Sequence, residues 1–215
     1  MPTQTSPYDK AGIAGILAET GRILASLQTA VKGVGHPVIV ISSATVKEGK
    51  STFAAGLGIV AARNSGGKVL LIDGNWHAPS LHTFFALENR FDLEVSLADD
   101  RLHQQIRQTP YPNLEILPAP RYQENPDTTQ NAVEVIRRLR HHYSLTIVDS
   151  AAILSANRHM VDPIALAAES DGLALTVLVN RTPRQMVKKA QTMLEVSKAR
   201  ILGLVINQYR NPLAT

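Results

Sequence analysis

Residues 38–52 read VIVISSATVKEGKST, an apolar run followed by a turn that contains glycine and lysine. From Ala44 the turn fits the phosphate-binding pattern Gly/Ala-x-x-x-x-Gly-Lys-Ser/Thr. The apolar run predicts a strand before the turn, and the small residues AAGLG at 54–58 predict a helix after it. Because phosphate-binding loops lie between a strand and a helix, the sequence predicts a nucleoside triphosphate site here, with a chance match in a surface turn as the alternative.

Each part of this loop has a role in holding phosphate. Backbone N–H groups of the turn point at phosphate oxygens, and the helix that follows adds its positive N-terminal end. Lys50 is expected to reach the β- and γ-phosphates, and the Ser51 hydroxyl is expected to ligate Mg²⁺. The other loop residues expected to contact the nucleotide are Ala44, Lys47, Glu48, Gly49 and Thr52.

The composition is that of an ordinary globular protein. The chain has 215 residues, 44% hydrophobic and 19% charged, which suffices for one domain with a full core. It has no cysteine, which excludes a disulfide framework and a thiolate metal site. We see neither a signal peptide nor an apolar stretch of about 20 residues, so we expect a cytoplasmic protein without a membrane span. If it works at a membrane, we expect another molecule to hold it there.

The net charge of +4 is modest, and aromatic residues make up only 5% of the chain. The aromatic residues are not interleaved with basic ones, so we expect no nucleic-acid partner. One basic cluster, RRLRHH at 137–142, falls at the end of a predicted helix, where positive charge complements the helix dipole. A solvated helix end explains the cluster, with an acidic partner or lipid headgroups as the alternatives.

The N-terminal part is expected to be a polar tail over residues 1–9 and a helix over 11–31. Its apolar seam, with alternating spacings of four and three, consists of Ile13, Leu17, Thr20, Leu24, Leu27 and Val31. We expect the seam to pack onto its own domain; a partner or a neighbouring subunit is the alternative. The predicted organisation is a tail and amphipathic helix over 1–36 and a P-loop nucleotide-binding domain over 37–211.

Beyond this helix, strands and helices alternate. Apolar runs predict strands at 38–41, 69–72, 114–117, 145–148, 173–178 and 201–206, and helices are predicted at 50–63, 131–142, 160–168 and 183–198. The last helix has Thr182 as its expected N-cap and Pro183 as its first residue. Residues 89–124 are expected to be irregular with a short helix. Strands that are apolar throughout and separated by helices indicate an α/β fold, a doubly wound, mostly parallel sheet with helices on both faces.

Two predicted strands end in aspartate. Asp73 follows residues 69–72 and Asp149 follows residues 145–148. Both should emerge at the same sheet edge as the phosphate-binding loop, because all are carboxyl ends of parallel strands. We expect one of them to hold Mg²⁺, directly or through water, while the other orients or deprotonates the attacking group. Lys50, Asp73 and Asp149 are the candidate catalytic residues, and Ser51, Asp73 and Asp149 the candidate metal ligands.

Three segments carry a resemblance to a known family: SATVKEGKST at 43–52, VLLIDGNWHAP at 69–79 and IVDS at 147–150. Together they resemble the cytoplasmic domains of bacterial tyrosine kinases of capsule and exopolysaccharide synthesis, which are relatives of the ParA and MinD ATPases. The resemblance runs from about residue 19 to about residue 210 and includes NLEILPA at 113–119, NP at 125–126 and VIN at 205–207.

The resemblance implies an ATP-binding fold with Walker A, A′ and B motifs. Lys50, Ser51 and Thr52 match the Walker A positions, Asp73 the first aspartate of A′, and Asp149 the Walker B aspartate. Asn207 matches the position that contacts adenine. The implied cofactors are ATP and Mg²⁺. The implied partner is the cytoplasmic tail of a Wzz-like membrane polysaccharide co-polymerase, which would recruit the protein to the inner face of the plasma membrane, and a homo-oligomer is a further expectation.

The sequence also departs from the pattern of that family. In A′ the second aspartate is replaced by Asn75 and the arginine by His77, so less negative charge is available for Mg²⁺. In the N-terminal oligomerisation element Glu-x-x-Arg-x-x-Arg, Ala25 replaces the second arginine. The five tyrosines lie at 8, 111, 122, 143 and 209, without the C-terminal cluster that such kinases phosphorylate.

Three functions follow as hypotheses. The first is an ATPase or kinase-like regulator of exopolysaccharide or capsule polymerisation and export. The second is a nucleotide-sensing module with weak catalysis that regulates a membrane polysaccharide co-polymerase. The third is a positioning ATPase like ParA or MinD; such proteins carry an additional lysine at the position that is Thr45 here.

Overall fold

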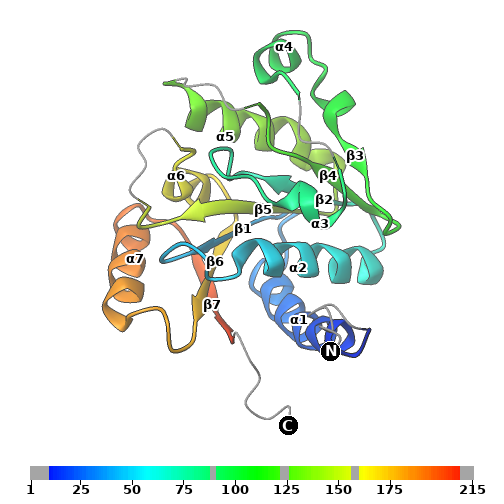
Figure 1. Cartoon of the computed structure of the whole chain (residues 1–215). Coiled ribbons are helices and arrows are strands. Elements are labelled where there is room, and N and C mark those ends of the chain that lie inside the picture. The colour runs from blue at the N-terminus through cyan, green and yellow to red at the C-terminus, as the bar shows by residue number, and fades with distance from the viewer. Residues whose placement is uncertain (1–9, 88–90, 122–125, 156–159, 209–215) are drawn as a thin grey trace, which may run out of the picture.

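A seven-stranded sheet forms the centre of the molecule in the computed structural model, which describes residues 10–87, 91–121, 126–155 and 160–208, with side chains from residue 19 onward (Figure 1). The strand order is β3-β4-β2-β5-β1-β6-β7, and only β3 is antiparallel to its neighbour. The strands are β1 (Val38–Ser43), β2 (Val69–Asp73), β3 (Arg107–Gln108), β4 (Leu114–Leu117), β5 (Leu145–Ala152), β6 (Gly172–Leu178) and β7 (Ile201–Asn207). The predicted doubly wound α/β fold is therefore confirmed.

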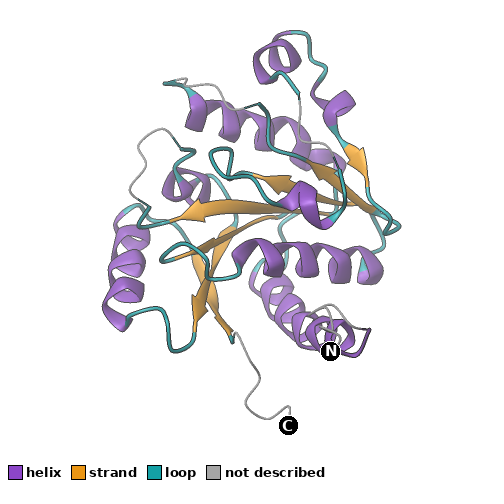
Figure 2. Cartoon of the chain, viewed as in Figure 1, coloured by secondary structure: helices purple, strands orange, loops and turns teal. Residues whose placement is uncertain are grey.

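Helices cover both faces of this sheet, as Figure 2 shows. The helices are α1 (Lys10–Ala30), α2 (Lys50–Asn64), α3 (Leu81–Phe84), α4 (Leu93–Ala98), α5 (Thr128–Leu139), α6 (Pro163–Ala168) and α7 (Arg184–Val196), with 3₁₀ turns at Leu102–Gln105 and Arg140–His142. One apolar core contains side chains of α1 and α2, and the other contains side chains of α5, α6 and α7. Every residue of β1, β2, β4 and β5 is buried, because each of these strands is covered on both faces.

The N-terminal helix packs onto its own domain. Thr20, Leu24, Leu27 and Val31 are buried, and the apolar ones belong to the core that α2 also lines. This confirms the expected packing for the second half of the seam. The side chains of Ile13 and Leu17 and the predicted tail over residues 1–9 lie outside the described residues.

The helix predicted from 131 begins earlier, at Thr128, and two predicted helix starts next to prolines were also wrong. The last helix begins at Arg184 with Pro183 as its N-cap, and Thr182 lies outside the helix, where its hydroxyl donates to the Glu48 carboxylate instead of capping. The helix predicted from 160 begins at Pro163, and the Asp162 carboxylate caps it by accepting from the Ile164 N–H at 2.8 Å. In both cases proline marks the start correctly, but whether it occupies the cap or the first helical position depends on tertiary contacts.

Residues 91–121 are more regular than predicted. They contain the short helix α4, a 3₁₀ turn and the edge strand β3, which pairs with β4 through Arg107 and Gln108. The Asp92 carboxylate caps α4 by accepting from the Val95 N–H at 3.1 Å. No period-two pattern marks β3 in the sequence, because a two-residue edge strand is too short to show one.

A buried polar network closes the amino-terminal end of the sheet. Glu115 of β4 accepts hydrogen bonds from the Tyr143 hydroxyl at 2.7 Å, the Gln108 amide at 2.8 Å and the Lys68 ammonium group. Burial alone would raise the pKa of Glu115, but these donors hold it below its usual value. The network lies at the opposite end of the strands from the phosphate-binding loop, so it serves stability.

We expect Tyr143→Phe to lower the free energy of unfolding by about 1–3 kcal/mol, because it leaves a buried carboxylate oxygen without its donor. Urea unfolding monitored by circular dichroism measures this change. Tyr111→Phe is the matched control: Tyr111 is half-buried, and among the described residues its hydroxyl has no hydrogen-bond partner. Equal losses in the two variants would contradict a role for the Tyr143–Glu115 bond.

Candidate nucleotide-binding site

The loop between β1 and α2 has the backbone of a tight phosphate-binding turn. Lys47 and Gly49 adopt positive φ angles of 63° and 82°. The Ser43 hydroxyl donates to the Thr45 carbonyl at 2.6 Å, and the Phe53 N–H donates to the Gly49 carbonyl at 2.9 Å as α2 begins. Two features disfavour any residue other than glycine at position 49. The backbone there is left-handed, and a Cβ would lie 2.1 Å from the Asn207 amide nitrogen.

Lys50 and Ser51 are the first two residues of α2, so their position is fixed by the helix start. The Lys50 side chain is largely buried, and its charge lowers the pKa of both Asp73 and Asp149. Ser51 is half-buried and Thr52 is exposed. The structure therefore brings Lys50 to both aspartates and Ser51 to Asp149, as the sequence predicted.

Glu48 lies in the loop with its carboxylate turned into the protein. It is 2% exposed, and its Oε1 accepts from the Thr45 hydroxyl at 2.7 Å and from the Thr182 hydroxyl. Its Oε2 has no hydrogen-bond partner within the part of the chain that the structure describes. A carboxylate in this position holds the loop against the turn between β6 and α7, which is a positioning role. The sequence analysis missed Thr182 here because it assigned that residue to a helix cap.

Asn207, at the end of β7, reaches the same loop from the other side. Its side-chain amide donates to the Glu48 carbonyl at 3.0 Å. One amide proton is therefore used by the protein, while the side-chain oxygen stays free to accept. The predicted adenine contact stays a prediction, and the structure adds a second role for this residue as a support of the loop.

Asp73 ends β2 and is completely buried. Its Oδ2 accepts from the N–H groups of Ser80 and Leu81, both at 3.0 Å, and its Oδ1 accepts from the Asn75 N–H at 3.2 Å. Burial raises the pKa of Asp73 to about 6, and these amides together with Lys50 limit the rise. Sequence reasoning missed these amides, because nothing in the sequence shows that the chain folds back at residues 80–81.

Asp149 lies beside Asp73 in the neighbouring strand β5, as the pairing register shows, and it is also completely buried. Among the described residues, neither of its carboxylate oxygens accepts a hydrogen bond, although the Ser51 hydroxyl is near enough to lower its pKa. Burial, and then the charge of Asp73, raise the pKa of Asp149 to about 7. The two carboxyl groups therefore differ: protein donors hold Asp73, and Asp149 has two free acceptors.

These acceptors fit a magnesium ion. Mg²⁺ prefers oxygen ligands and keeps several waters, so it is bound through one or two carboxylates together with phosphate oxygens. Asp149 offers unpartnered oxygens near the Ser51 hydroxyl, and a bound cation would relieve the burial of its charge. Within the described parts of the chain, no three His, Cys, Asp or Glu side chains come together as a complete metal cage. The residues present thus suit a metal that arrives with phosphate.

The segment after Asp73 is ordered by local contacts. Asn75 donates from its side-chain amide to the Ala78 carbonyl at 2.8 Å, which closes a turn. Trp76 is buried in the core shared by α5, α6 and α7. His77 is exposed. Asn75 and His77, the two residues of this segment that depart from the family pattern, thus follow Asp73 closely in the sequence.

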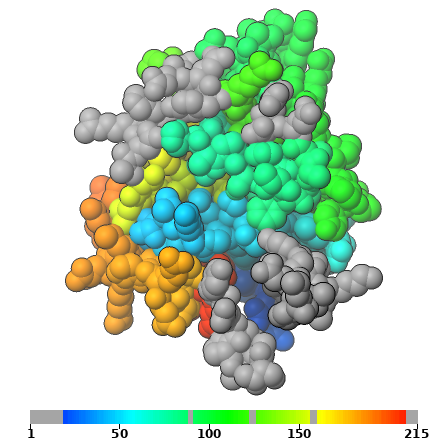
Figure 3. Space-filling model, in the orientation of Figure 1, coloured from blue at the N-terminus to red at the C-terminus, as the bar shows by residue number. Residues whose placement is uncertain are grey.

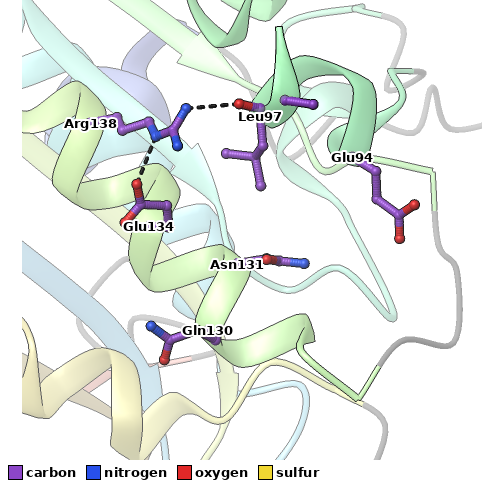
Figure 4. A pocket seen from close by; sticks show the side chains of 7 residues that line it. Glu94, Leu97, Gln130, Asn131, Glu134 and Arg138 are labelled. Atoms are coloured by element: carbon purple, nitrogen blue, oxygen red, sulfur yellow. Dashed lines mark hydrogen bonds and ion pairs between the residues drawn. The ribbon is translucent and has the colours of Figure 1, made fainter. Parts of the chain in front are cut away.

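A cavity of about 500 Å³ lies elsewhere, between α4 and α5 (Figure 4). It is lined by Glu94, Leu97, Ala98, Gln130, Asn131, Glu134 and Arg138. Arg138 spans it, donating to the Glu134 carboxylate at 2.7 Å and to the Leu97 carbonyl at 2.9 Å. None of the predicted site residues lines this cavity, so it is not the nucleotide site; a loop that wraps phosphate with backbone N–H groups needs no deep apolar pocket.

The two raised pKa values predict how stability depends on pH. The folded protein keeps protons that the unfolded chain releases between the ordinary carboxyl pKa of 3.8 and about 7. Stability of the metal-free protein should therefore fall as the pH rises through this interval. We expect Asp149→Asn to remove the repulsion and to raise the melting temperature at pH 8 by on the order of 5 °C.

Thermal melting in the presence of a chelator, at pH 5 and at pH 8, measures this effect. Asp99→Asn is the control, since Asp99 is exposed and pairs with Arg101 at the surface. A variant Asp149→Asn that melts at the same temperature as the parent at pH 8 would show that the buried pair is not a source of instability.

Comparison with known proteins agrees with this geometry. The CobQ/CobB/MinD/ParA nucleotide binding domain matches residues 39–215. The tyrosine-protein kinase YwqD of Bacillus subtilis is 31% identical over 174 residues, which are 79% of this chain and 71% of YwqD. Two solved structures share the fold. The kinase domain of the Escherichia coli tyrosine kinase ETK has a TM-score of 0.77 and 22% identity, covering 93% of this chain and 78% of that one.

The septum site-determining protein MinD of Pyrococcus horikoshii, complexed with Mg-ADP, has a TM-score of 0.63 and 23% identity, covering 80% of this chain and 70% of that one. No helix within the described residues has the length and apolar character required to cross a bilayer. The family match covers most of the chain, and the YwqD match covers most of both proteins. The chain therefore belongs to the CobQ/CobB/MinD/ParA nucleotide-binding family and, within it, is a homologue of the bacterial tyrosine-protein kinase YwqD.

Proposed function

We propose that this protein binds ATP with Mg²⁺ at the loop 44–52 and transfers or releases the γ-phosphate, as a kinase-like ATPase that regulates capsule or exopolysaccharide polymerisation and export. The observation that supports it most directly is Asp149, a buried carboxyl group with two unpartnered oxygens beside Lys50 and Ser51. The kinship with YwqD supports the biological setting.

The contacts of the site residues suggest different roles in binding phosphate and in binding metal. Backbone N–H groups of residues 44–52 and the Lys50 ammonium group would hold the phosphates and offset their charge. Ser51 and Asp149 would hold Mg²⁺, which supplies charge neutralisation at the phosphate oxygens when bound. Asp73 is less suited to direct metal binding, because three N–H groups already use three of its four lone pairs.

Asp73 is better suited to accept a proton. Its Oδ1 accepts one hydrogen bond and so keeps a free lone pair, and its pKa of about 6 is close to that of an effective general base near neutral pH. Three backbone N–H groups hold the carboxylate in one orientation, which is the preorganisation that proton transfer requires. In this scheme Asp73 orients or deprotonates the attacking water or hydroxyl group.

We propose a partner and a location as part of the same hypothesis. The protein would work in the cytoplasm beside a Wzz-like polysaccharide co-polymerase, whose cytoplasmic tail would recruit and activate it, and would assemble with copies of itself. Of its tyrosines, Tyr143 is buried and its hydroxyl is used by Glu115. Tyr111 is half-buried, and the other three lie outside the described residues. A substrate tyrosine is therefore expected outside the folded core.

Lys50→Ala is the decisive variant. We expect phosphate release from Mg-ATP to fall by at least about a hundredfold, because a buried cation that offsets phosphate charge is lost. Phosphate release and phosphotyrosine are measured in the same reaction, with and without the cytoplasmic tail of a candidate co-polymerase. Lys32→Ala, an exposed lysine outside the site, is the matched control.

The outcomes separate the hypotheses. Phosphotyrosine that disappears in Lys50→Ala establishes kinase activity, and phosphate release alone establishes an ATPase. Turnover that survives Lys50→Ala would contradict the assigned site.

A nucleotide-sensing module with weak catalysis is the second candidate. Asn75 favours it, since the residue at this position supplies no charge to a metal and its amide is committed to the Ala78 carbonyl. We expect Asn75→Asp to tighten Mg²⁺ binding several-fold in the presence of nucleotide, because metal affinity follows ligand charge. Titration of Mg²⁺ into the ADP-bound protein measures it. Unchanged Mg²⁺ affinity would remove Asn75 as the reason for weak catalysis.

A further inference from the structure

The segment 181–200, which includes α7, concentrates positive charge. It contains six basic residues, Arg181, Arg184, Lys188, Lys189, Lys198 and Arg200, and one acidic residue, Glu195. Its net charge is thus 6 − 1 = +5, whereas the whole chain carries +4. All six basic residues are exposed. The positive charge of the molecule is therefore concentrated in this segment. In the sequence, the basic run at 137–142 is more conspicuous than the dispersed charges at 181–200.

The basic residues of this segment have no acidic partners. Considering only the described parts of the chain, none of the six forms an ion pair, and Arg200 donates to the Ala30 carbonyl at 2.6 Å. The cluster at 137–142 behaves differently: Arg137, Arg138 and Arg140 pair with Glu169, Glu134 and Asp171. That cluster ties α5 to its surroundings, whereas the cations of α7 remain available for a partner.

Apolar side chains are exposed on the same helix. Of the nine large apolar residues exposed in the described chain, three lie on α7: Met186, Met193 and Val196, at 42%, 37% and 79% exposure. With Lys189 they are spaced at i, i+3, i+7 and i+10, which places them in one stripe along the helix. Ala190 and Leu194 face the core and are fully buried.

We call the exposed side of α7, with Arg184, Lys188, Lys189, Met186, Met193 and Val196, the outer face of α7. In Figure 3 the orange side chains of this region project from the lower left of the molecule into solvent. The helix has 13 residues, about 20 Å of length. Its exposed side combines apolar side chains with cations that form no ion pair among the described residues.

We propose that the outer face of α7 docks onto an anionic lipid bilayer. A helix lying in the plane of a bilayer buries an apolar stripe at the acyl boundary while its lysines and arginines reach the headgroups. Each such cation near an anionic surface contributes about 1 kcal/mol. Lipid fits better than an acidic protein, because a bilayer surface takes up exposed apolar side chains together with unpaired cations, whereas an acidic segment would use only the cations.

This docking goes beyond the proposed function and does not depend on nucleotide. It gives the protein a membrane contact of its own, in addition to any held by a partner. The N-terminus of α7 also directly follows Thr182 and Pro183, and Thr182 donates to Glu48 of the phosphate-binding loop. The docked helix would therefore hold the candidate site near the membrane surface.

Co-sedimentation of the nucleotide-free protein with vesicles tests the proposal. We expect binding to vesicles rich in phosphatidylglycerol, little binding to phosphatidylcholine, and weakening as salt rises. Lys188→Gln with Lys189→Gln should weaken binding roughly thirty-fold, since two cations are lost. Met186→Ser with Met193→Ser should weaken it roughly tenfold, since both side chains lose their burial in lipid.

The matched control is Lys32→Gln with Arg121→Gln, which removes the same charge from exposed positions outside α7 and should leave binding unchanged. Thermal melting checks that each variant is folded. The proposal is overturned if the protein does not bind the anionic vesicles, or if the control loses as much affinity as the lysine variant. It is also overturned if soluble poly-glutamate binds through Lys188 and Lys189 while vesicles do not, which would identify an acidic protein as the occupant.

Discussion

The burial of two carboxyl groups side by side, Asp73 and Asp149, is the constraint on which the rest of this molecule depends. The parallel sheet produces it, because the register between β2 and β5 pairs the two residues at the carboxyl edge. Two buried like charges are unfavourable in an empty protein, and the chain offsets them in different ways. Backbone amides surround Asp73, Lys50 lies near both, and Asp149 keeps oxygens that only a cation or a proton can satisfy. A bound cation would offset the repulsion between the two buried carboxyl groups, which favours the binding of metal together with phosphate.

The position of these side chains at one edge of the sheet could be predicted from the sequence, because it follows from local sequence patterns. An apolar run that ends in aspartate and a loop that ends in Gly-Lys-Ser each specify a position on the fold by themselves. The parallel sheet then brings Lys50, Asp73 and Asp149 together without further information. The buried half of the first helix was equally predictable, since Leu24, Leu27 and Val31 repeat at helical spacing.

What the sequence could not show are contacts between distant segments. Thr182 resembles a helix cap, yet its hydroxyl belongs to Glu48, 134 residues away. The amides of Ser80 and Leu81 hold Asp73 only because the chain turns back there. The charges of α7 and those at 137–142 look alike in the sequence. They differ in the structure because Glu169, Glu134 and Asp171 neutralise one group and not the other.

The last described strand ends in Asn207, whose amide holds the Glu48 carbonyl across 159 residues of sequence. The same side chain fills the space that any residue larger than glycine would need at position 49. The end of β7 thus supports the phosphate-binding loop through the Asn207 side chain. During synthesis on a ribosome, the loop emerges early and stays without this support until β7 has been made. Ligand binding is consequently coupled to completion of the chain, and a prematurely terminated product would lack a finished site.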